Sequence, residues 1–149
     1  MSYKHTQTGW LTLMVCGALL PFFVITAVIT PDAPVRTFML FVTAPILAVV
    51  IILFGSLTVA VDDAAITMRF GPGLIRKKIK LDDVAACEPV KNRWWWGWGI
   101  QLIPGGWLYN VSGLDAVELK LKNGRVCRIG TDEPQILNEF IQAKLNQPL

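Results

Sequence analysis

Two long apolar runs near the N-terminus constrain the fold of this chain more than any other feature. Residues 11–30 and 37–57 contain no charged side chain over 20 and 21 residues, respectively. About 20 apolar residues are needed to cross a hydrocarbon core roughly 30 Å thick, so each run is long enough to form a membrane-spanning helix. The chain is 53% hydrophobic and only 17% charged, which is too apolar for a typical soluble domain of this length.

The two spans, at about residues 10–30 and 37–57, are predicted to form a tight antiparallel hairpin. Only residues 31–36 separate them, so both ends of the hairpin lie on the same side of the membrane. A cleavable signal peptide is the alternative for the first run, but that run is long, holds Pro21 near its centre and lacks a clear small-residue cleavage site. Neither span contains a charged or strongly polar side chain, which argues against an ion or substrate path through them.

The positive charges predict the orientation of the hairpin. Lys4 precedes the first span, and Arg69 and residues 76–78 follow the second, whereas the short loop between the spans carries Arg36 offset by Asp32. Lysine and arginine near membrane spans are enriched on the cytoplasmic side. We therefore expect both the N-terminus and the C-terminal domain to be cytoplasmic.

After residue 57 the pattern changes to an alternation of apolar and polar residues, which is typical of half-buried strands. Strands are predicted within the segments 57–62, 65–70, 74–81, 84–90, 107–113, 115–121 and 125–130. Asn123 and Gly124 are predicted to form a two-residue hairpin turn. The chain thus divides into an N-terminal tail (1–9), a membrane hairpin (10–57) and a mainly-β domain (58–149) of about six or seven strands.

A C-terminal amphipathic helix is predicted to close the domain. Its apolar stripe consists of Ile136, Leu137, Phe140, Ile141 and Leu145. Asp132 is expected to cap the helix, with Gln135 three residues later as in a capping box and Pro134 in the first turn, where its missing N–H costs little.

The order of these elements resembles that of small bacterial membrane proteins that carry a pleckstrin-homology-like (PH-like) domain. The resemblance covers nearly the whole chain and includes the phrases FGPGLIRKKI (70–79), WGWGI (96–100), GGWLYNVSG (105–113), VELKLKNGR (117–125) and IGTDEP (129–134). It implies a curved antiparallel sheet bent into an open barrel and capped by the C-terminal helix. It also implies location in the bacterial inner (plasma) membrane, but no agreed biochemical activity.

One departure from the better-known eukaryotic relatives concerns phosphoinositide binding. Those relatives bind inositol phosphates through basic residues in the first hairpin, whereas this chain has Asp62 and Asp63 there. Phosphoinositide binding in that mode is therefore not expected.

The segment KNRWWWGWGI (91–100) contains four tryptophans within five positions. We expect it to belong to a long connection, 91–110, between two strands. Three interpretations are open for its tryptophans. They pack in the core of the domain or over an open barrel end; they lie in the lipid headgroup layer, where tryptophan concentrates; or they anchor a partner or another copy of the protein.

The headgroup interpretation supplies the candidate site. Almost no sequence separates the second span from the first strand, so the domain is held close to the bilayer. Basic residues near an anionic surface stabilise binding by about 1 kcal/mol each. For the basic residues of the predicted strand 74–81, the alternative interpretation is that they lie on a solvated strand edge. The candidate interface residues are Arg93, Trp94, Trp95, Trp96, Trp98, Trp107, Arg76, Lys78 and Lys80.

The sequence predicts no catalytic, cofactor or metal site. The only histidine, His5, lies in the tail and is expected to be solvated, so the domain has no histidine base. The acidic pairs 62–63 and 82–83 are typical of turns, and Cys16, Cys87 and Cys127 have no metal-type spacing and are predicted to be buried, reduced thiols. A net charge of only +3, with acidic residues interleaved, does not favour nucleic-acid binding.

The predicted function is therefore a non-enzymatic, membrane-anchored binding or scaffolding module. Its partners are expected to be the bilayer with its anionic headgroups, a membrane protein, or a second copy of the chain. The alternative is an accessory subunit of a larger transport or envelope-stress membrane complex, with a homo-oligomer as its variant.

Overall fold

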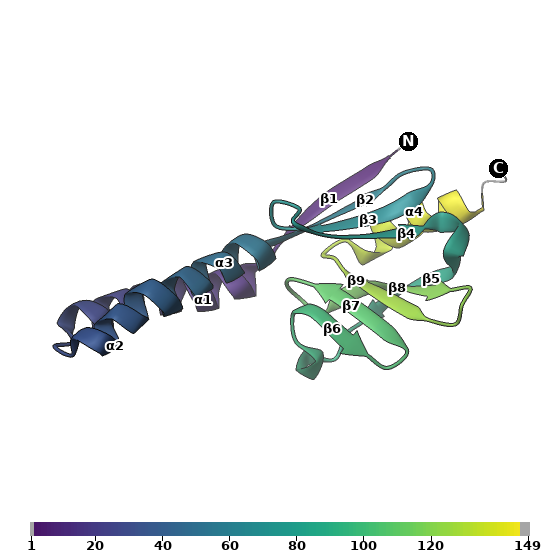
Figure 1. Ribbon diagram of the computed structural model, residues 1–149. Helices are drawn as coiled ribbons and strands as arrows, with labels where there is room; N and C mark the ends of the chain where they lie inside the picture. Colours follow the sequence, from purple (N-terminus) through teal and green to yellow (C-terminus); the bar gives the residue numbers. More distant parts are fainter. Residues whose placement is uncertain (1, 147–149) are drawn as a thin grey trace.

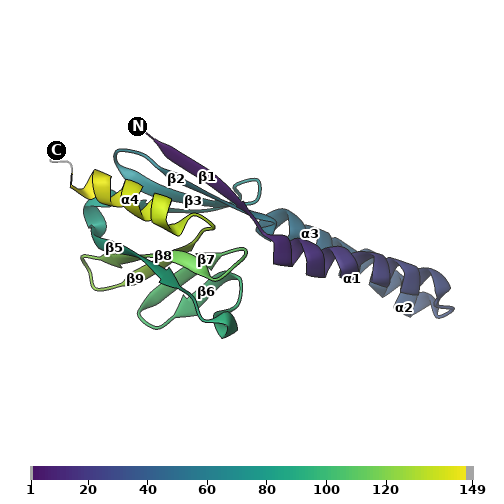
Figure 2. The same ribbon diagram turned by 180° about the vertical axis from the view of Figure 1, so that it is seen from behind.

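The computed structural model describes residues 2–146 as a helical hairpin joined to a β domain of two sheets (Figure 1). Helix α1 (Trp10–Ile29) packs against a second long helix that consists of α2 (Ala33–Phe38), the π-helical turn η1 (Met39–Thr43) and α3 (Ala44–Phe54). Both are long and apolar enough to cross a membrane. The second helix buries none of its residues, and Figures 1 and 2 show the hairpin projecting away from the β domain, unlike the core helix of a soluble protein.

The second helix begins earlier in the chain than the sequence pattern predicts. Asp32 caps it by accepting a hydrogen bond from the Val35 N–H at 3.3 Å, so helical structure begins at Ala33 and the loop is shorter than residues 31–36. The π-helical turn η1 ends two residues before Pro45, which has no N–H to donate and whose ring crowds the preceding turn. The wider turn accommodates the proline within a continuous helix. At the other end, residues 56 and 57 belong to a strand rather than to the span.

The N-terminal segment, expected to be a tail, forms strand β1 (Tyr3–Thr8). This strand pairs antiparallel with β2 (Ser56–Val61), from Tyr3 opposite Val61 to Thr8 opposite Ser56. The hairpin is thus an insertion between two neighbouring strands of one sheet, and the Gly9 N–H donates to the Gly55 carbonyl at 2.8 Å where the two chains meet. The inward face of β1 carries tyrosine, histidine and glutamine rather than aliphatic residues, which explains why hydrophobic alternation does not reveal it.

The remaining strands form two sheets that face each other without closing into a barrel. The first sheet has the order β1-β2-β3-β4 and the second β5-β8-β9-β7-β6, with β7 and β9 parallel. Their bounds are β3 (Ala65–Phe70), β4 (Ile75–Lys80), β5 (Val84–Lys91), β6 (Gly99–Ile103), β7 (Gly106–Asn110), β8 (Asp115–Leu121) and β9 (Val126–Gly130). Eight strands therefore follow the hairpin, because the expected long connection 91–110 contains the β6–β7 hairpin.

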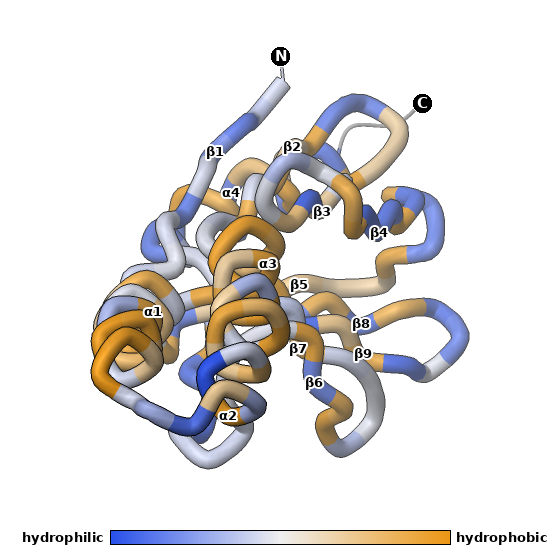
Figure 3. Tube along the Cα trace, turned by 60° about the vertical axis from the view of Figure 1, so that its left-hand side comes forward, coloured by the Kyte–Doolittle hydropathy of each residue, from blue (hydrophilic) through white to orange (hydrophobic). Residues whose placement is uncertain are grey.

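The core lies between the two sheets and beneath α4 (Pro134–Leu145), which packs on β5 and β8. Leu137 and Ile141 are fully buried there, whereas Ile136 of the predicted stripe is exposed. Figure 3 shows the contrast between the mostly hydrophobic residues along the hairpin helices and the alternating hydropathy along the strands. α4 covers one side of the space between the sheets (Figure 2).

The start of α4 differs from the predicted capping box. Glu133 occupies the N-cap position without a side-chain hydrogen bond, and its N–H donates to Thr131 Oγ1 at 3.1 Å. Asp132 instead lies with Oδ1 at 2.6 Å from His5 Nε2. Asp132, which was expected to cap α4, and His5, which was expected to be solvated, therefore contact each other and join the start of α4 to β1.

Because β1 is packed on the domain, Tyr3 is expected to ionise at a higher pH than a solvent-exposed tyrosine. Burial, and then the nearby Glu133 carboxylate, raises the pKa of Tyr3 from 10.0 to about 12. A Tyr109→Phe variant leaves Tyr3 as the only tyrosine. In the folded variant we expect little tyrosinate absorbance at pH 10, whereas in urea Tyr3 should titrate with the ordinary tyrosine pKa of 10.0. Because the folded-state pKa lies above the unfolded one, ionisation favours the unfolded chain, so the free energy of unfolding falls as the pH rises from about 10 towards 12. If Tyr3 in the folded protein titrated with its midpoint at pH 10, β1 would be detached from the domain.

Candidate functional site

The tryptophan-rich segment forms a compact turn next to the end of the hairpin. The 3₁₀ turn η3 (Trp94–Trp96) follows β5, and Gly97, with a φ of 75°, then redirects the chain into β6. Figures 1 and 2 show this short helical turn beside β6, on the side of the β domain from which the hairpin projects. A Cβ atom on Gly99 would lie only 3.7 Å from Phe54 Cε1, so β6 starts against the last residue of α3.

Trp96 is held on the outer face of the second sheet by Arg128. The Arg128 guanidinium lies 4.8 Å from the centroid of the Trp96 ring, and its Nε donates to Glu118 Oε2 at 2.6 Å. Its Nη1 also donates to Asn92 Oδ1 at 3.3 Å. Glu118 is only 8% exposed and lies opposite Arg128 across β8 and β9. Trp96 is therefore fixed by a cation–π contact with a nearly buried ion pair.

Trp94 and Trp95 are instead directed to the solvent. Their exposed fractions are 69% and 58%, and the two rings pack edge to face with centroids 5.9 Å apart. The Arg93 guanidinium lies 5.3 Å from the Trp95 centroid. Trp98 is half-buried, and its indole N–H has no hydrogen-bond partner among the described residues. Trp98 is therefore partly covered by the domain, whereas Trp94 and Trp95 are not packed in its core.

Two exposed apolar side chains that the sequence analysis did not select lie at the same end of the domain. Trp10, the first residue of α1, is 64% exposed, and Leu74, in the turn between β3 and β4, is 77% exposed. This turn touches α3, since a Cβ atom on Gly71 would collide with the carbonyl oxygen of Ile52. We call Trp10, Leu74, Trp94 and Trp95 the hairpin-side surface. The position of Trp10 directly before an apolar run is typical of an interfacial aromatic belt and was available from the sequence.

The other predicted interface residues are dispersed, and only Arg76 lies beside the β3–β4 turn, where its Nε donates to the Gly73 carbonyl at 2.6 Å. Arg76, Lys78 and Lys80 are exposed along β4, the edge strand of the first sheet, and Lys80 is at the end of β4 far from the hairpin. Trp107, on β7, is half-exposed in the opening between the two sheets, together with Arg76. The nine predicted residues therefore do not form one continuous surface.

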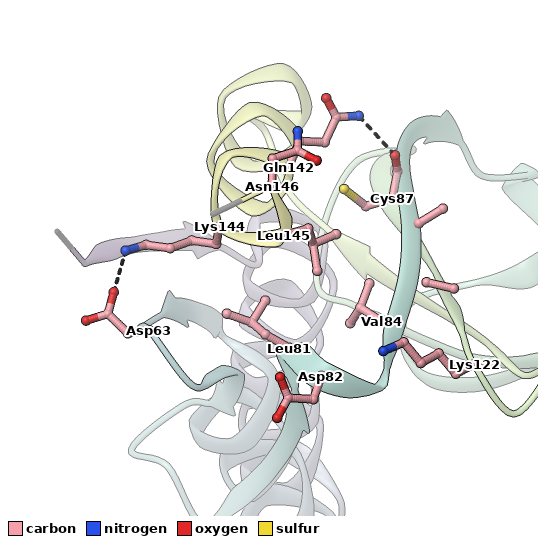
Figure 4. A pocket seen from close by; sticks show the side chains of 12 residues that line it. Asp63, Leu81, Asp82, Val84, Cys87, Lys122, Gln142, Lys144, Leu145 and Asn146 are labelled. Carbon is pink, nitrogen blue, oxygen red and sulfur yellow. Dashed lines mark hydrogen bonds and ion pairs between the residues drawn. The ribbon is translucent and has the colours of Figure 1, made fainter. Parts of the chain in front are cut away.

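A cavity of about 690 Å³ lies between α4, η2 (Leu81–Asp83) and β5, at the side of the domain (Figure 4). Lys144 forms an ion pair with Asp63 at its edge, which lowers the pKa of Asp63, and Gln142 Nε2 donates to the Cys87 carbonyl at 3.3 Å. Burial raises the pKa of the Cys87 thiol, so at neutral pH it is protonated and a poor nucleophile.

The cysteines and the acidic residues provide no further reactive or metal-binding site among the described residues. Cys16, Cys87 and Cys127 are buried and unpaired, and burial raises the pKa of Cys127 to about 12. Within residues 2–146, no group of three or more histidine, cysteine, aspartate or glutamate side chains is arranged to hold a metal ion.

Comparisons with known proteins do not assign the chain. No protein-family model matches it, and no curated protein is significantly similar to it. What the structure shares with the expected PH-like membrane proteins is the order of a helical hairpin, a β-sheet domain and a C-terminal helix packed on that domain.

Proposed function

We propose that this protein is a non-enzymatic, membrane-anchored binding module whose β domain rests on the inner leaflet through the hairpin-side surface. The observation that carries the proposal is the position of Trp10, Leu74, Trp94 and Trp95, which are exposed at the end of the domain where two apolar helices leave it. Tryptophan combines an apolar ring with one hydrogen-bond donor and favours the headgroup layer. The basic residues after the second helix favour a cytoplasmic β domain.

Two further features support this function. Arg93 lies beside the exposed tryptophans, where its charge attracts anionic headgroups at about 1 kcal/mol. The two facing sheets with α4 at one side support the proposed PH-like fold, although the expected all-antiparallel arrangement is broken by the parallel pair β7–β9 and the membrane hairpin is inserted after the first strand. The alternative role, as a subunit of a larger membrane complex, uses the same exposed tryptophans as anchors for protein, and the experiment below separates the two.

Quenching of tryptophan emission tests the proposal on the full-length chain in proteoliposomes. The emission of Trp94 and Trp95 is obtained by subtracting the spectrum of a Trp94→Phe/Trp95→Phe variant from that of the wild type. We expect lipids brominated near the acyl carbonyls to quench this difference spectrum strongly, and aqueous acrylamide to quench it weakly. The same difference spectrum in liposomes without brominated lipid is the unquenched reference.

Two outcomes would contradict lipid contact. Strong quenching by acrylamide and none by brominated lipid would place both rings in water. Protection from both quenchers would place them against protein and favour the subunit hypothesis. Circular dichroism checks that the double variant is folded, which we expect because both side chains are largely exposed.

A further inference from the structure

The side of the two sheets opposite α4 is open and forms a cleft. Two hollows of about 540 Å³ and about 340 Å³ lie between β4 and the strands β6, β7 and β9. They share Lys77, Trp107 and Tyr109, so they are adjoining parts of one cleft. We call it the inter-sheet cleft, and none of the four residues of the hairpin-side surface lines it.

The floor of the inter-sheet cleft is apolar and partly aromatic. Trp107 is half-exposed in it, beside the buried Tyr109. Ile75 and Ile100 line one part, and Leu121 and Val126 line the other, all of them only partly buried. A continuous apolar floor that the domain itself does not cover favours an apolar ligand.

The rim of the cleft is cationic. Its five basic residues are Arg76, Lys77 and Lys78 on β4 and Lys122 and Arg125 in the β8–β9 turn. Within residues 2–146 none of them forms an ion pair, whereas Lys120, Arg128 and Lys144 do. Asp83 is the one acidic residue among the described residues that line the cleft. The rim is therefore complementary to an anion.

The side chain of Lys77 lies on the face of β4 that is directed toward the cleft. It lies between Ile75 and Ile79 in the two-residue alternation of β4, at a position whose neighbours face inward. A lysine at such a position is tolerated here because the space in front of it is open rather than packed. Lys77 and the buried Cys127 line the same hollow, which agrees with that direction.

One end of the cleft adjoins the hairpin. Phe70, which lines the smaller hollow, packs edge to face on Phe54 of α3 with ring centroids 5.7 Å apart. Ile100, on the opposite wall, follows Gly99, which itself lies against Phe54. If α3 crosses a bilayer, the cleft therefore begins near its surface.

We propose that the inter-sheet cleft binds an anionic phospholipid of the surrounding leaflet, with an acyl chain along the apolar floor and the phosphate at the cationic rim. This inference rests on the proposed function, in which the β domain sits on the leaflet. Charge complementarity, the uncovered floor and the continuity with the hairpin together favour a lipid over an acidic peptide, which would need only the rim and the free edge of β4.

Lipid binding to the delipidated full-length chain in neutral detergent tests the inference. The probes are dioctanoyl phosphatidylglycerol and dioctanoyl phosphatidylcholine, which have the same chains and differ in net charge, and bound lipid is counted by native mass spectrometry. We expect saturable binding of one phosphatidylglycerol, at least about tenfold tighter than phosphatidylcholine. A Lys77→Glu/Arg125→Glu variant should lose this preference, and Lys80→Glu, which reverses a β4 charge outside the cleft, should keep it.

Several results would overturn the inference. These are equal binding of the two lipids, the same loss in Lys80→Glu as in the cleft variant, or tighter binding of a glutamate-rich peptide than of phosphatidylglycerol. Lys77→Gln/Arg125→Gln, checked by thermal unfolding, replaces the reversal variant if that variant fails to fold. Because the assay needs no bilayer, its failure leaves the quenching result intact, and failure of the quenching experiment leaves the binding constants interpretable.

Discussion

Replacement of residues 10–54 by Asn-Gly is expected to yield a water-soluble, folded β domain. The hairpin enters and leaves the sheet at Gly9 and Gly55, whose backbones are hydrogen-bonded at 2.8 Å. A two-residue turn of the Asn-Gly type spans such a pair and matches the twist of the two strands. The change removes the two apolar helices and keeps β1 next to β2. Gel filtration without detergent, circular dichroism and urea unfolding measure the outcome.

A chain of residues 56–149 alone is the informative comparison, because it lacks β1. Without β1, the edge of β2 loses the backbone partners of Leu57, Val59 and Val61, and the side chains of Tyr3 and Gln7 no longer cover the core. We expect a loss on the order of 5 kcal/mol in the free energy of unfolding, comparable to the whole stability of a small domain. Equal urea midpoints for the two soluble chains would show that β1 is not part of the folded domain.

Arg128→Ala is expected to destabilise the β domain by about 3 kcal/mol. The substitution leaves Glu118, which is only 8% exposed, without its cationic partner, and Asn92 Oδ1 without its donor. It also removes the guanidinium from the Trp96 ring, so the emission of Trp96 should shift as the turn loosens. Urea unfolding of the full-length chain in detergent, followed by circular dichroism, measures the loss of stability.

A variant that removes both charges separates the charge effect from a general packing defect. Glu118→Leu/Arg128→Leu removes both charges and should recover most of the stability, because apolar residues of similar size often replace a buried ion pair at little cost. Lys120→Ala, on the same strand as Glu118 but in an exposed ion pair with Glu88, should cost less than about 1 kcal/mol. If Arg128→Ala and Lys120→Ala have similar effects, the ion pair does not support the tryptophan turn.

The parts of the fold that could be predicted from the sequence are those with a strong hydrophobic period. Uninterrupted apolar runs revealed the helices, and regular alternation revealed strands such as β3 and β8. β1 escaped because its inward residues are polar, and β6 because it is short and lies among glycines and tryptophans. Asp132 could not be placed because its partner, His5, is 127 residues away in the chain.

The candidate site was predictable only in part, for a related reason. Composition identified a tryptophan cluster, but it could not separate Trp96, fixed by a cation from β9, from the exposed Trp94 and Trp95. Trp107 was grouped with them by residue type, although its strand places it between the two sheets. Lys77, which faces the inter-sheet cleft, carried a signal that was overlooked: a charged residue at an inward position of an alternating strand.

The insertion of the hairpin between β1 and β2 has a mechanical consequence. A domain on a single tether can swivel about it and present any face to its surroundings, but this domain is joined to its helices by two short chain segments, each ending in a paired strand. Rotation of the sheet would have to twist both helices with it. The hairpin and the first sheet therefore turn as one lever, and any tilt of the helices is transmitted directly to the first sheet.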